Sequence, residues 1–171
     1  MSLGLYLHIP YCFSKCRYCD FYSHPGERGV PEAYVDALLR ELSRFAPEAP
    51  LQPDTLYFGG GTPSLLRPEQ AKRLIDAARP MPGAEITLEA NPETVTEESL
   101  AGFREAGVNR ISFGVQSARD TQLRTLGRPH TAKQARAAFA AARRAGFANI
   151  SGDIMLALPH YTEAEFDETL E

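Results

Sequence analysis

The sequence predicts an α/β protein in which helices cover a parallel β-sheet. Short apolar runs alternate five times with amphipathic segments of helical length, which is the pattern of parallel strands joined by helical crossovers. The connections are short, and no low-complexity linker interrupts them. The length of 171 residues, with 43% hydrophobic and 23% charged residues, suits one globular domain.

Strands are expected where apolar runs meet turn-forming residues, at residues 5–9, 54–58, 85–90, 110–115 and 149–156. Helices are expected where apolar residues recur with helical spacing, at residues 31–45, 68–78, 97–106 and 132–145. A short amphipathic turn is expected at 121–126, and a last helix begins near Glu163. Prolines and glycines that end strands or cap helices bound several of these elements: Pro10, Pro47, Pro50, Gly107 and Gly146.

Every cysteine of the protein lies on the loop after the first strand. Cys12, Cys16 and Cys19 have the spacing C-x3-C-x2-C. An iron-sulfur cluster normally takes four cysteine ligands, so three from one loop would leave one iron of a 4Fe-4S cluster without a protein ligand. The loop is therefore a candidate cluster site with one open iron.

Two other roles for these thiols compete with cluster binding. A Cys3His zinc site with His8 or His24 needs the same thiolates, but structural zinc sites usually take ligand pairs from two loops, and the sequence has no second loop of that kind. A disulfide framework fails because three cysteines leave one over. Cluster ligation is favoured, and a zinc-stabilised α/β module stays as an alternative.

Residues able to do chemistry are concentrated directly after the predicted strands. In parallel α/β folds the ligand site lies at the carboxyl ends of the strands, so the segments that follow them share one rim. These segments are the cysteine loop, Gly59-Gly60-Gly61-Thr62-Pro63, Glu89 to Pro92, Gln116-Ser117 and Asp153 to Pro159. We expect this rim to be the binding site.

The rim residues also have ordinary interpretations when each is taken alone. The glycines let a backbone approach a ligand, but they equally indicate a tight turn. Glu89 ends an apolar run and needs a partner there, unless it is a surface carboxylate. Arg128 suits a solvated loop cation, and Asp153 suits a turn or cap. Tyr6 and Tyr18 suit core or shielding aromatics.

The cysteine loop, within HIPYCFSKCRYCDF, resembles that of the radical S-adenosylmethionine (SAM) superfamily. The segments GGGTPSLL, EANPET and GVQS extend the resemblance over nearly all of the chain. More narrowly, the chain is similar to the oxygen-independent coproporphyrinogen III oxidase family and, within it, to heme-chaperone relatives. The resemblance implies a partial radical SAM barrel, which is a TIM-like, open and curved parallel sheet with outer helices.

The resemblance also implies cofactors and their ligands. Cys12, Cys16 and Cys19 would bind a 4Fe-4S cluster, and the amino and carboxylate groups of SAM would chelate its open iron. The positions implied in SAM binding are Tyr6, Tyr18, Gly60, Gly61, Thr62, Glu89, Gln116, Arg128 and Asp153. An electron donor would then support reductive cleavage of SAM to a 5′-deoxyadenosyl radical. Whether that radical attacks a substrate is a separate question, so enzymatic turnover stays open.

The residues after the third cysteine favour the heme-chaperone branch. Phe21 stands where the true coproporphyrinogen oxidases carry a fourth cysteine. Heme is therefore the expected cargo and heme-accepting proteins are expected partners, with decarboxylation of coproporphyrinogen III as the alternative function. One segment departs from the family, because LALPHYT, with His160 and Tyr161, stands where relatives usually have a glycine and a glutamine.

Charge and hydropathy limit the location and the partners. A net charge of -4 argues against general nucleic-acid binding. No apolar run approaches membrane-spanning length, and the N-terminal residues MSLGLYLHIP do not form a secretory signal. We therefore expect a cytoplasmic protein with reduced thiols. We also expect residues 1–171 to be the radical SAM core of a longer protein whose C-terminal domain lies beyond them, because the sequence ends inside a predicted helix.

Overall fold

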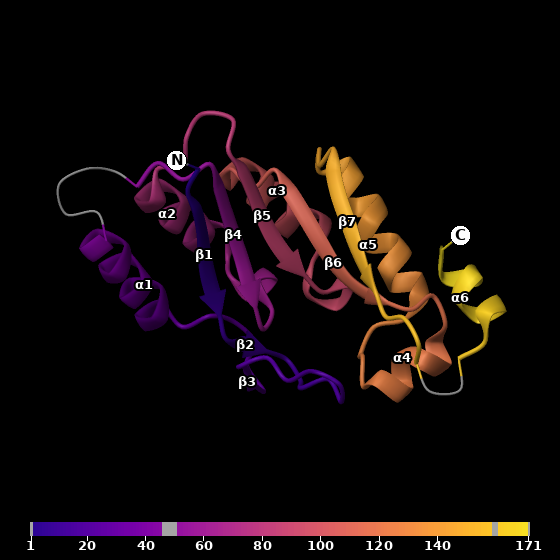
Figure 1. Ribbon diagram of the computed structural model, residues 1–171. Coiled ribbons are helices and arrows are strands. Elements are labelled where there is room, and N and C mark those ends of the chain that lie inside the picture. Colours follow the sequence, from indigo (N-terminus) through magenta and orange to yellow (C-terminus); the bar gives the residue numbers. More distant parts are fainter. Residues whose placement is uncertain (1, 46–50, 159–160, 171) are drawn as a thin grey trace.

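A computed structural model of the protein describes residues 2–45, 51–158 and 161–170. Its centre is a five-stranded parallel sheet with the strand order β1-β4-β5-β6-β7 (Figure 1). The strands of this sheet are β1 (Gly4–Ile9), β4 (Thr55–Gly60), β5 (Glu85–Ala90), β6 (Arg110–Gln116) and β7 (Asn149–Ile154). The predicted α/β class and open parallel sheet are confirmed.

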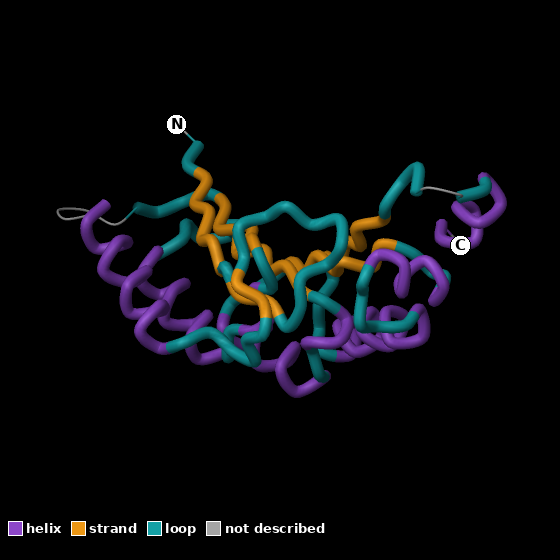
Figure 2. The backbone as a smooth tube through the Cα atoms, turned by 90° about the horizontal axis from the view of Figure 1, so that it is seen from below, coloured by secondary structure: helices purple, strands orange, loops and turns teal. Residues whose placement is uncertain are grey.

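Most of the helices gather on the convex side of the curved sheet (Figure 2). The helices are α1 (Glu32–Phe45), α2 (Pro68–Ala78), α3 (Glu97–Ala106), α4 (Asp120–Leu126), α5 (Ala132–Arg144) and α6 (Glu163–Leu170). Two single-turn 3-10 helices, η1 (Pro63–Leu65) and η2 (Pro92–Thr94), directly follow the rim segments of β4 and β5. The cysteine loop adds a two-residue parallel pair, β2 (Tyr11–Cys12) with β3 (His24–Pro25).

The structure shifts several predicted boundaries. The strand predicted at residues 54–58 is β4, and it continues through Gly60, because Gly59 and Gly60 pair with the last residues of β1. The last strand ends at Ile154 rather than residue 156, and Ala157 then takes a positive φ of 54° that turns the chain away. The predicted helix-ending residues Pro47 and Pro50 lie outside the described residues.

The core lies between the sheet and its helices. Its largest fully buried side chains come from the strands, from α2 and α3, and from the segment after α5: Leu56, Phe58, Leu88, Ile111, Phe113, Leu74, Leu100, Phe103 and Phe147. Full burial of one such side chain contributes about 1.5–3 kcal/mol.

The ends of α3 show the expected capping residues. Gly107 caps its C-terminal end with a positive φ of 114°, and Thr96 accepts a hydrogen bond from Ser99 N at its N-terminal end.

The strand register determines where the loops meet. Ile9 pairs with Gly60, Ala90 pairs with Phe113, and Gln116 pairs with Ile154. The carboxyl ends of the five strands therefore form one continuous rim, as the sequence predicts.

Within residues 2–45, 51–158 and 161–170, no helix combines the length and apolar character that a membrane crossing requires.

We expect Gly102→Ala to lower the free energy of unfolding by about 1–3 kcal/mol, although alanine favours helices. A Cβ at Gly102 of α3 would stand 2.7 Å from Cγ and 2.9 Å from Cβ of Pro68 at the start of α2, so the two helices would have to separate. Gly29→Ala is the control, because the nearest atom there is Leu65 O at 4.0 Å. Urea unfolding measures both; a stabilised Gly102→Ala variant would contradict the tight helix contact.

Candidate functional site

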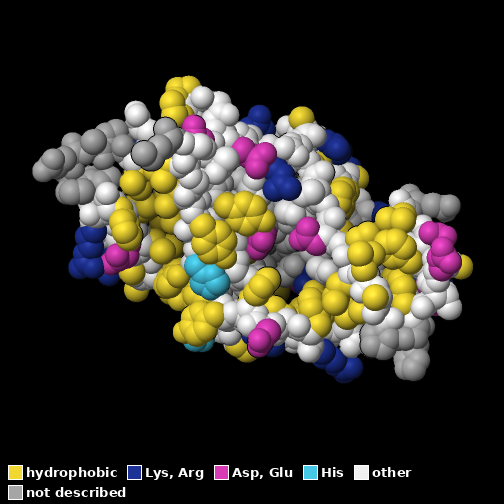
Figure 3. All heavy atoms as spheres, viewed as in Figure 1, with side chains coloured by type: hydrophobic (Ala, Val, Ile, Leu, Met, Phe, Trp, Pro, Cys, Tyr) yellow, Lys and Arg dark blue, Asp and Glu magenta, His cyan; other side chains and the backbone are white. Residues whose placement is uncertain are grey.

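A cavity of about 260 Å³ opens at the carboxyl ends of the strands. Figure 3 shows a hollow on this face of the molecule with acidic and hydrophobic side chains at its edge. Its lining includes eleven of the twelve predicted site residues: Cys12, Cys16, Tyr18, Cys19, Gly60, Gly61, Thr62, Glu89, Gln116, Arg128 and Asp153. The fold therefore gathers in one place residues that are spread over most of the chain.

The cysteine loop is tied to α4 and to itself by backbone hydrogen bonds. Arg17 N donates to Leu126 O at 3.0 Å, and Cys19 N donates to Cys16 O at 3.2 Å. All three cysteines are free thiols; Cys12 is buried, whereas Cys16 and Cys19 are partly exposed. The loop thus presents three sulfur atoms beside the cavity, which is the donor chemistry that a 4Fe-4S cluster takes.

The donor arrangement bears on the zinc alternative. Among the residues that the structure describes, no three His, Cys, Asp or Glu side chains are grouped as ligands of one metal ion. Three thiols on one loop are the donor set that a 4Fe-4S cluster takes, and zinc stays the alternative for them.

Arg128 is a buried cation at the cavity, with only 8% of its surface exposed. Its Nη2 donates to Asn91 Oδ1 and to Gly114 O, each at 2.6 Å, and its Nη1 donates to Cys16 Sγ at 3.4 Å. Its Nε is buried and has no hydrogen-bond partner within the described residues. The solvated-cation interpretation of Arg128 is therefore wrong.

The glycine loop brings backbone close to the cysteines. Gly60 has a positive φ of 115°, where a side chain would be strained. A Cβ at Gly61 would stand 3.0 Å from Cys12 Sγ and 2.7 Å from Tyr11 O. Thr62 is buried, and its hydroxyl lies 3.5 Å from Cys12 Sγ. These glycines are therefore needed for close approach to the cysteine loop as well as for a turn.

Glu89 is a partly buried carboxylate with two donors. Tyr57 Oη donates to Oε1 at 2.8 Å, and Gly60 N donates to Oε2 at 3.2 Å. Burial raises the pKa of the Glu89 carboxyl, and the charge of Asp153 adds to the rise, while the two hydrogen bonds oppose it. Glu89 is thus held in place inside the cavity, and the surface-carboxylate interpretation is wrong.

Gln116 and Asp153 lie on neighbouring strands at the irregular end of the sheet. The β6–β7 register shifts between Gly114 and Gln116, and Gln116 has a positive φ of 67°. Such bulges often aim a side chain near a binding site, and a left-handed non-glycine residue is strained. Asp153 is exposed and accepts a hydrogen bond from Ser112 Oγ at 3.4 Å. Both side chains line the cavity.

The two predicted tyrosines differ in their placement. Tyr18 lines the cavity, and burial raises the pKa of its hydroxyl to about 12 while the charge of Arg128 opposes that rise. Tyr6 stands outside the lining of this cavity and is 54% exposed. It stacks on Tyr57 with ring centroids 6.1 Å apart, and its hydroxyl contacts His8 Nδ1 at 3.1 Å. Tyr6 therefore stands behind Tyr57, whose hydroxyl donates to Glu89 in the cavity.

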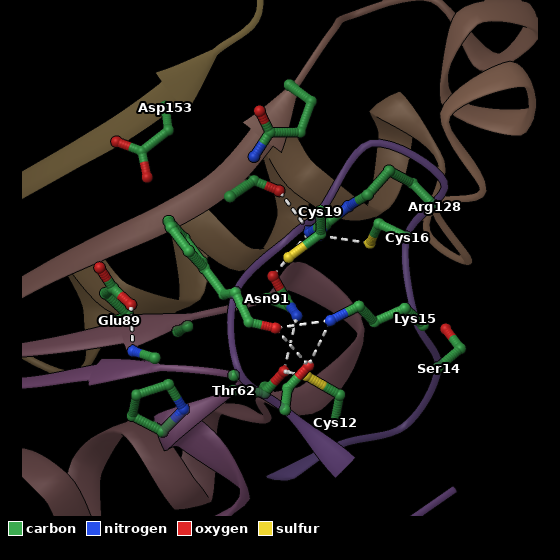
Figure 4. A pocket seen from close by; sticks show the side chains of 18 of the residues that line it. Cys12, Ser14, Lys15, Cys16, Cys19, Thr62, Glu89, Asn91, Arg128 and Asp153 are labelled. Carbon is green, nitrogen blue, oxygen red and sulfur yellow. Dashed lines mark hydrogen bonds between the residues drawn. The ribbon is translucent and has the colours of Figure 1, made fainter. Parts of the chain in front are cut away.

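Several lining residues were not predicted as site residues. They include Ser112 and Gly114 and, labelled in Figure 4, Ser14, Lys15 and Asn91. Asn91 could have been found, because it directly follows the third predicted strand, but the Asn-Pro pair also indicates a turn. The segment LALPHYT, which departs from the family pattern, is described only in part. Tyr161 Oη donates to Ser117 Oγ at 3.5 Å, whereas Pro159 and His160 lie outside the described residues.

We expect Tyr57→Phe to lower the free energy of unfolding by about 1–2 kcal/mol at pH 7. The lost hydrogen bond from Tyr57 holds down the pKa of Glu89, so it stabilises the fold most when Glu89 is ionised. The loss should therefore shrink as the pH falls through the Glu89 pKa.

The control for this prediction is Tyr34→Phe, because Tyr34 Oη donates to the neutral carbonyl of His8 at 2.8 Å. The free energy of unfolding that Tyr34→Phe loses should therefore not change as a carboxylate titrates. Urea unfolding at several pH values measures both variants, and a loss in Tyr57→Phe that is the same at every pH would refute the prediction.

Comparison with known proteins supports this assembly of residues. Residues 6–171 match the Radical SAM superfamily. The chain is 43% identical over 163 residues to the "Heme chaperone HemW" of Escherichia coli (strain K12) and 39% identical over 172 residues to that of Bacillus subtilis (strain 168). These alignments cover 92% and 96% of this chain but 43% and 45% of the relatives, so the chain spans less than half of their length.

A solved structure extends the comparison to the fold. The coproporphyrinogen III oxidase (HemN) of Escherichia coli, a radical SAM enzyme, matches with a TM-score of 0.88 and 31% identity. The match covers 99% of this chain and 40% of that one. The family match over residues 6–171, the parallel sheet and the three-cysteine loop at its rim together show that this chain belongs to the radical SAM superfamily, a membership that implies a 4Fe-4S cluster and SAM.

Proposed function

We propose that the protein of which this chain forms part is a heme chaperone, which binds heme and transfers it to acceptor proteins. The observation that carries the proposal is the 39–43% identity to heme chaperones over 92–96% of the chain. These relatives extend well beyond the region that they share with this chain, so the heme-binding residues are assigned to no position here.

We assign the cluster to Cys12, Cys16 and Cys19. They share one loop, and hydrogen-bond donors already reach two of their sulfur atoms. Donors of this kind stabilise thiolates that carry the negative charge of a cluster. When bound, the cluster and SAM would supply reductive cleavage of the sulfonium, with the electron coming from an external donor. Because these thiols must stay reduced, the proposal places the protein in the cytoplasm.

SAM is assigned to the cavity beside the cluster. The methionine end of SAM carries one amino and one carboxylate group, and the cavity offers a complementary charge for each. Glu89 supplies a carboxylate on one side, and Arg128 supplies a guanidinium on the other. Gly60 and Gly61 leave room for backbone contacts, and Gln116 offers an uncharged amide for the ribose or the adenine.

Phe21 is the residue that favours a chaperone over an oxidase. It stands where the resemblance places a fourth cysteine in true coproporphyrinogen oxidases, and it lines the cavity with 65% of its surface exposed. A phenyl ring fills space there but offers no sulfur for ligation or hydrogen-atom exchange. The site therefore lacks at this position a reactive group that the oxidases carry.

Oxidative decarboxylation of coproporphyrinogen III is the second candidate function. It is favoured by the TM-score of 0.88 to the Escherichia coli oxidase. Since one fold hosts many reactions, this likeness weighs less than the identity of the residues at the cavity.

We expect replacement of Cys12, Cys16 or Cys19 by serine to remove most of the iron from anaerobically reconstituted protein, because a neutral hydroxyl is a poor cluster ligand. Iron and sulfide analysis and visible absorption measure the loss. Asp20→Ser on the same loop is the control and should keep the cluster, because Asp20 is exposed and stands outside the cavity lining. Stoichiometric zinc without iron-sulfur absorption in the unaltered protein would refute the assignment.

The function is tested on the full-length protein under anaerobic conditions with a reductant. We expect SAM to change the EPR spectrum of the reduced cluster, because SAM would bind its open iron. We also expect saturable heme binding and no turnover of coproporphyrinogen III. Formation of protoporphyrinogen at enzymatic rates, without heme binding, would overturn the chaperone proposal and establish the oxidase.

A further inference from the structure

A series of hydrogen bonds connects two cysteine sulfur atoms across the cavity (Figure 4). Arg128 Nη1 donates to Cys16 Sγ at 3.4 Å, and Thr62 Oγ1 donates to Cys12 Sγ at 3.5 Å. Asn91 stands between the two donors. Its Oδ1 accepts from Arg128 Nη2 at 2.6 Å, and its Nδ2 donates to Thr62 Oγ1 at 3.1 Å. One amide side chain thus contacts both residues that reach the sulfur atoms.

The chemistry of the groups determines the direction of these hydrogen bonds. A guanidinium only donates, so Asn91 must turn its oxygen to Arg128 and its NH2 group to Thr62. The Thr62 hydroxyl then accepts from Asn91, which leaves its own hydrogen for Cys12 Sγ. If the amide were reversed, its NH2 group would face the donors of Arg128, and its oxygen would draw the Thr62 hydrogen away from the sulfur.

The surrounding structure holds Asn91 in this place. Its backbone carbonyl accepts from Thr94 N at 3.0 Å and from Thr94 Oγ1 at 2.9 Å, and Ser64 Oγ lies 2.6 Å from that hydroxyl. Gly114 of the neighbouring strand leaves room for it, because a Cβ there would stand 2.9 Å from Asn91 Oδ1 and 3.1 Å from Arg128 Nη2. The backbone of Asn91 is therefore fixed at the end of its own strand, and its side chain is accommodated by the next strand.

We propose that Asn91 is a positioning residue for the cluster. It directs Arg128 toward Cys16 and Thr62 toward Cys12, and through them it governs how firmly the cluster is held and at what potential it is reduced. Hydrogen bonds and positive charge beside ligating sulfur atoms stabilise the reduced, more negative cluster. The inference rests on the proposed function, because it requires the cluster on these three cysteines.

The test compares variants of the full-length, anaerobically reconstituted protein. Asn91→Ala removes the contacts to both Arg128 and Thr62. Thr62→Val removes the donor to Cys12 and the acceptor of Asn91 Nδ2 but leaves the contact between Asn91 and Arg128, and the double variant measures their coupling. Asn109→Ala is the matched control, since Asn109 accepts from Ile86 N and donates to Ala84 O, both at 2.8 Å, at the opposite end of the sheet. EPR-monitored redox titration measures the midpoint potential, and a chelator measures the rate of cluster loss.

We expect Asn91→Ala to reduce at a more negative potential than the unaltered protein and to lose its cluster about 10-fold faster. Loss of an outer-shell partner costs about 10–100-fold in metal affinity, and Asn91 acts through two such partners. Thr62→Val should show part of the change, and the double variant less than the sum, because Asn91 acts through Thr62. Asn109→Ala should keep the unaltered potential even if it is less stable.

The outcomes separate this inference from the proposed function. If Asn91→Ala matches Asn109→Ala in potential and in rate of cluster loss, the role of Asn91 is refuted while cluster binding stands. If Asn91→Ala holds no cluster whereas Asn109→Ala does, the positioning role is supported. If the unaltered protein takes up no cluster, the proposed function fails, and the inference fails with it.

Discussion

The parallel register of the sheet is the constraint on which the site depends. Because β1, β4, β5 and β6 run in one direction with matched ends, the loops that follow them must meet at one rim. The cysteine loop follows β1, the glycine loop follows β4, and Asn91 follows β5. A register slip of one residue in any strand would turn its side chains to the other face and separate the groups that line the cavity.

The cavity joins a carboxylate and a guanidinium without pairing them with each other. Glu89 is held by Tyr57 and the backbone of Gly60, while Arg128 is held by Asn91 and Gly114 O. Each charge therefore has neutral hydrogen-bond partners and stays available for a ligand, at the energetic cost that partial burial of a charge carries. In the proposed function, the amino group and the carboxylate of SAM carry the charges complementary to these two groups.

The same network gives the cysteine loop its electrostatic surroundings. Arg128 Nη1 reaches Cys16 Sγ, and the Thr62 hydroxyl reaches Cys12 Sγ, so charge on these sulfur atoms is compensated by groups from outside the loop. The loop itself is tied to α4 through Arg17. In the proposed function, cluster binding and SAM binding would therefore share one set of residues, and Arg128 would contribute to both.

The sequence by itself determined the α/β class, the order of the elements, the three-cysteine loop and the set of segments at the rim. These features follow from local properties, since hydrophobic periodicity, prolines, glycines and residue spacing act over a few positions. Only the tertiary structure decided that Arg128 is buried, that Glu89 pairs with Tyr57, that Tyr6 stands outside the cavity and that Asn91 lies between Arg128 and Thr62. The partners in these contacts are 29 to 112 positions apart in the chain, as for Asn91 with Thr62 and Arg128 with Cys16. Side-chain hydrogen bonds over such separations depend on strand register and loop packing, and no local pattern encodes them.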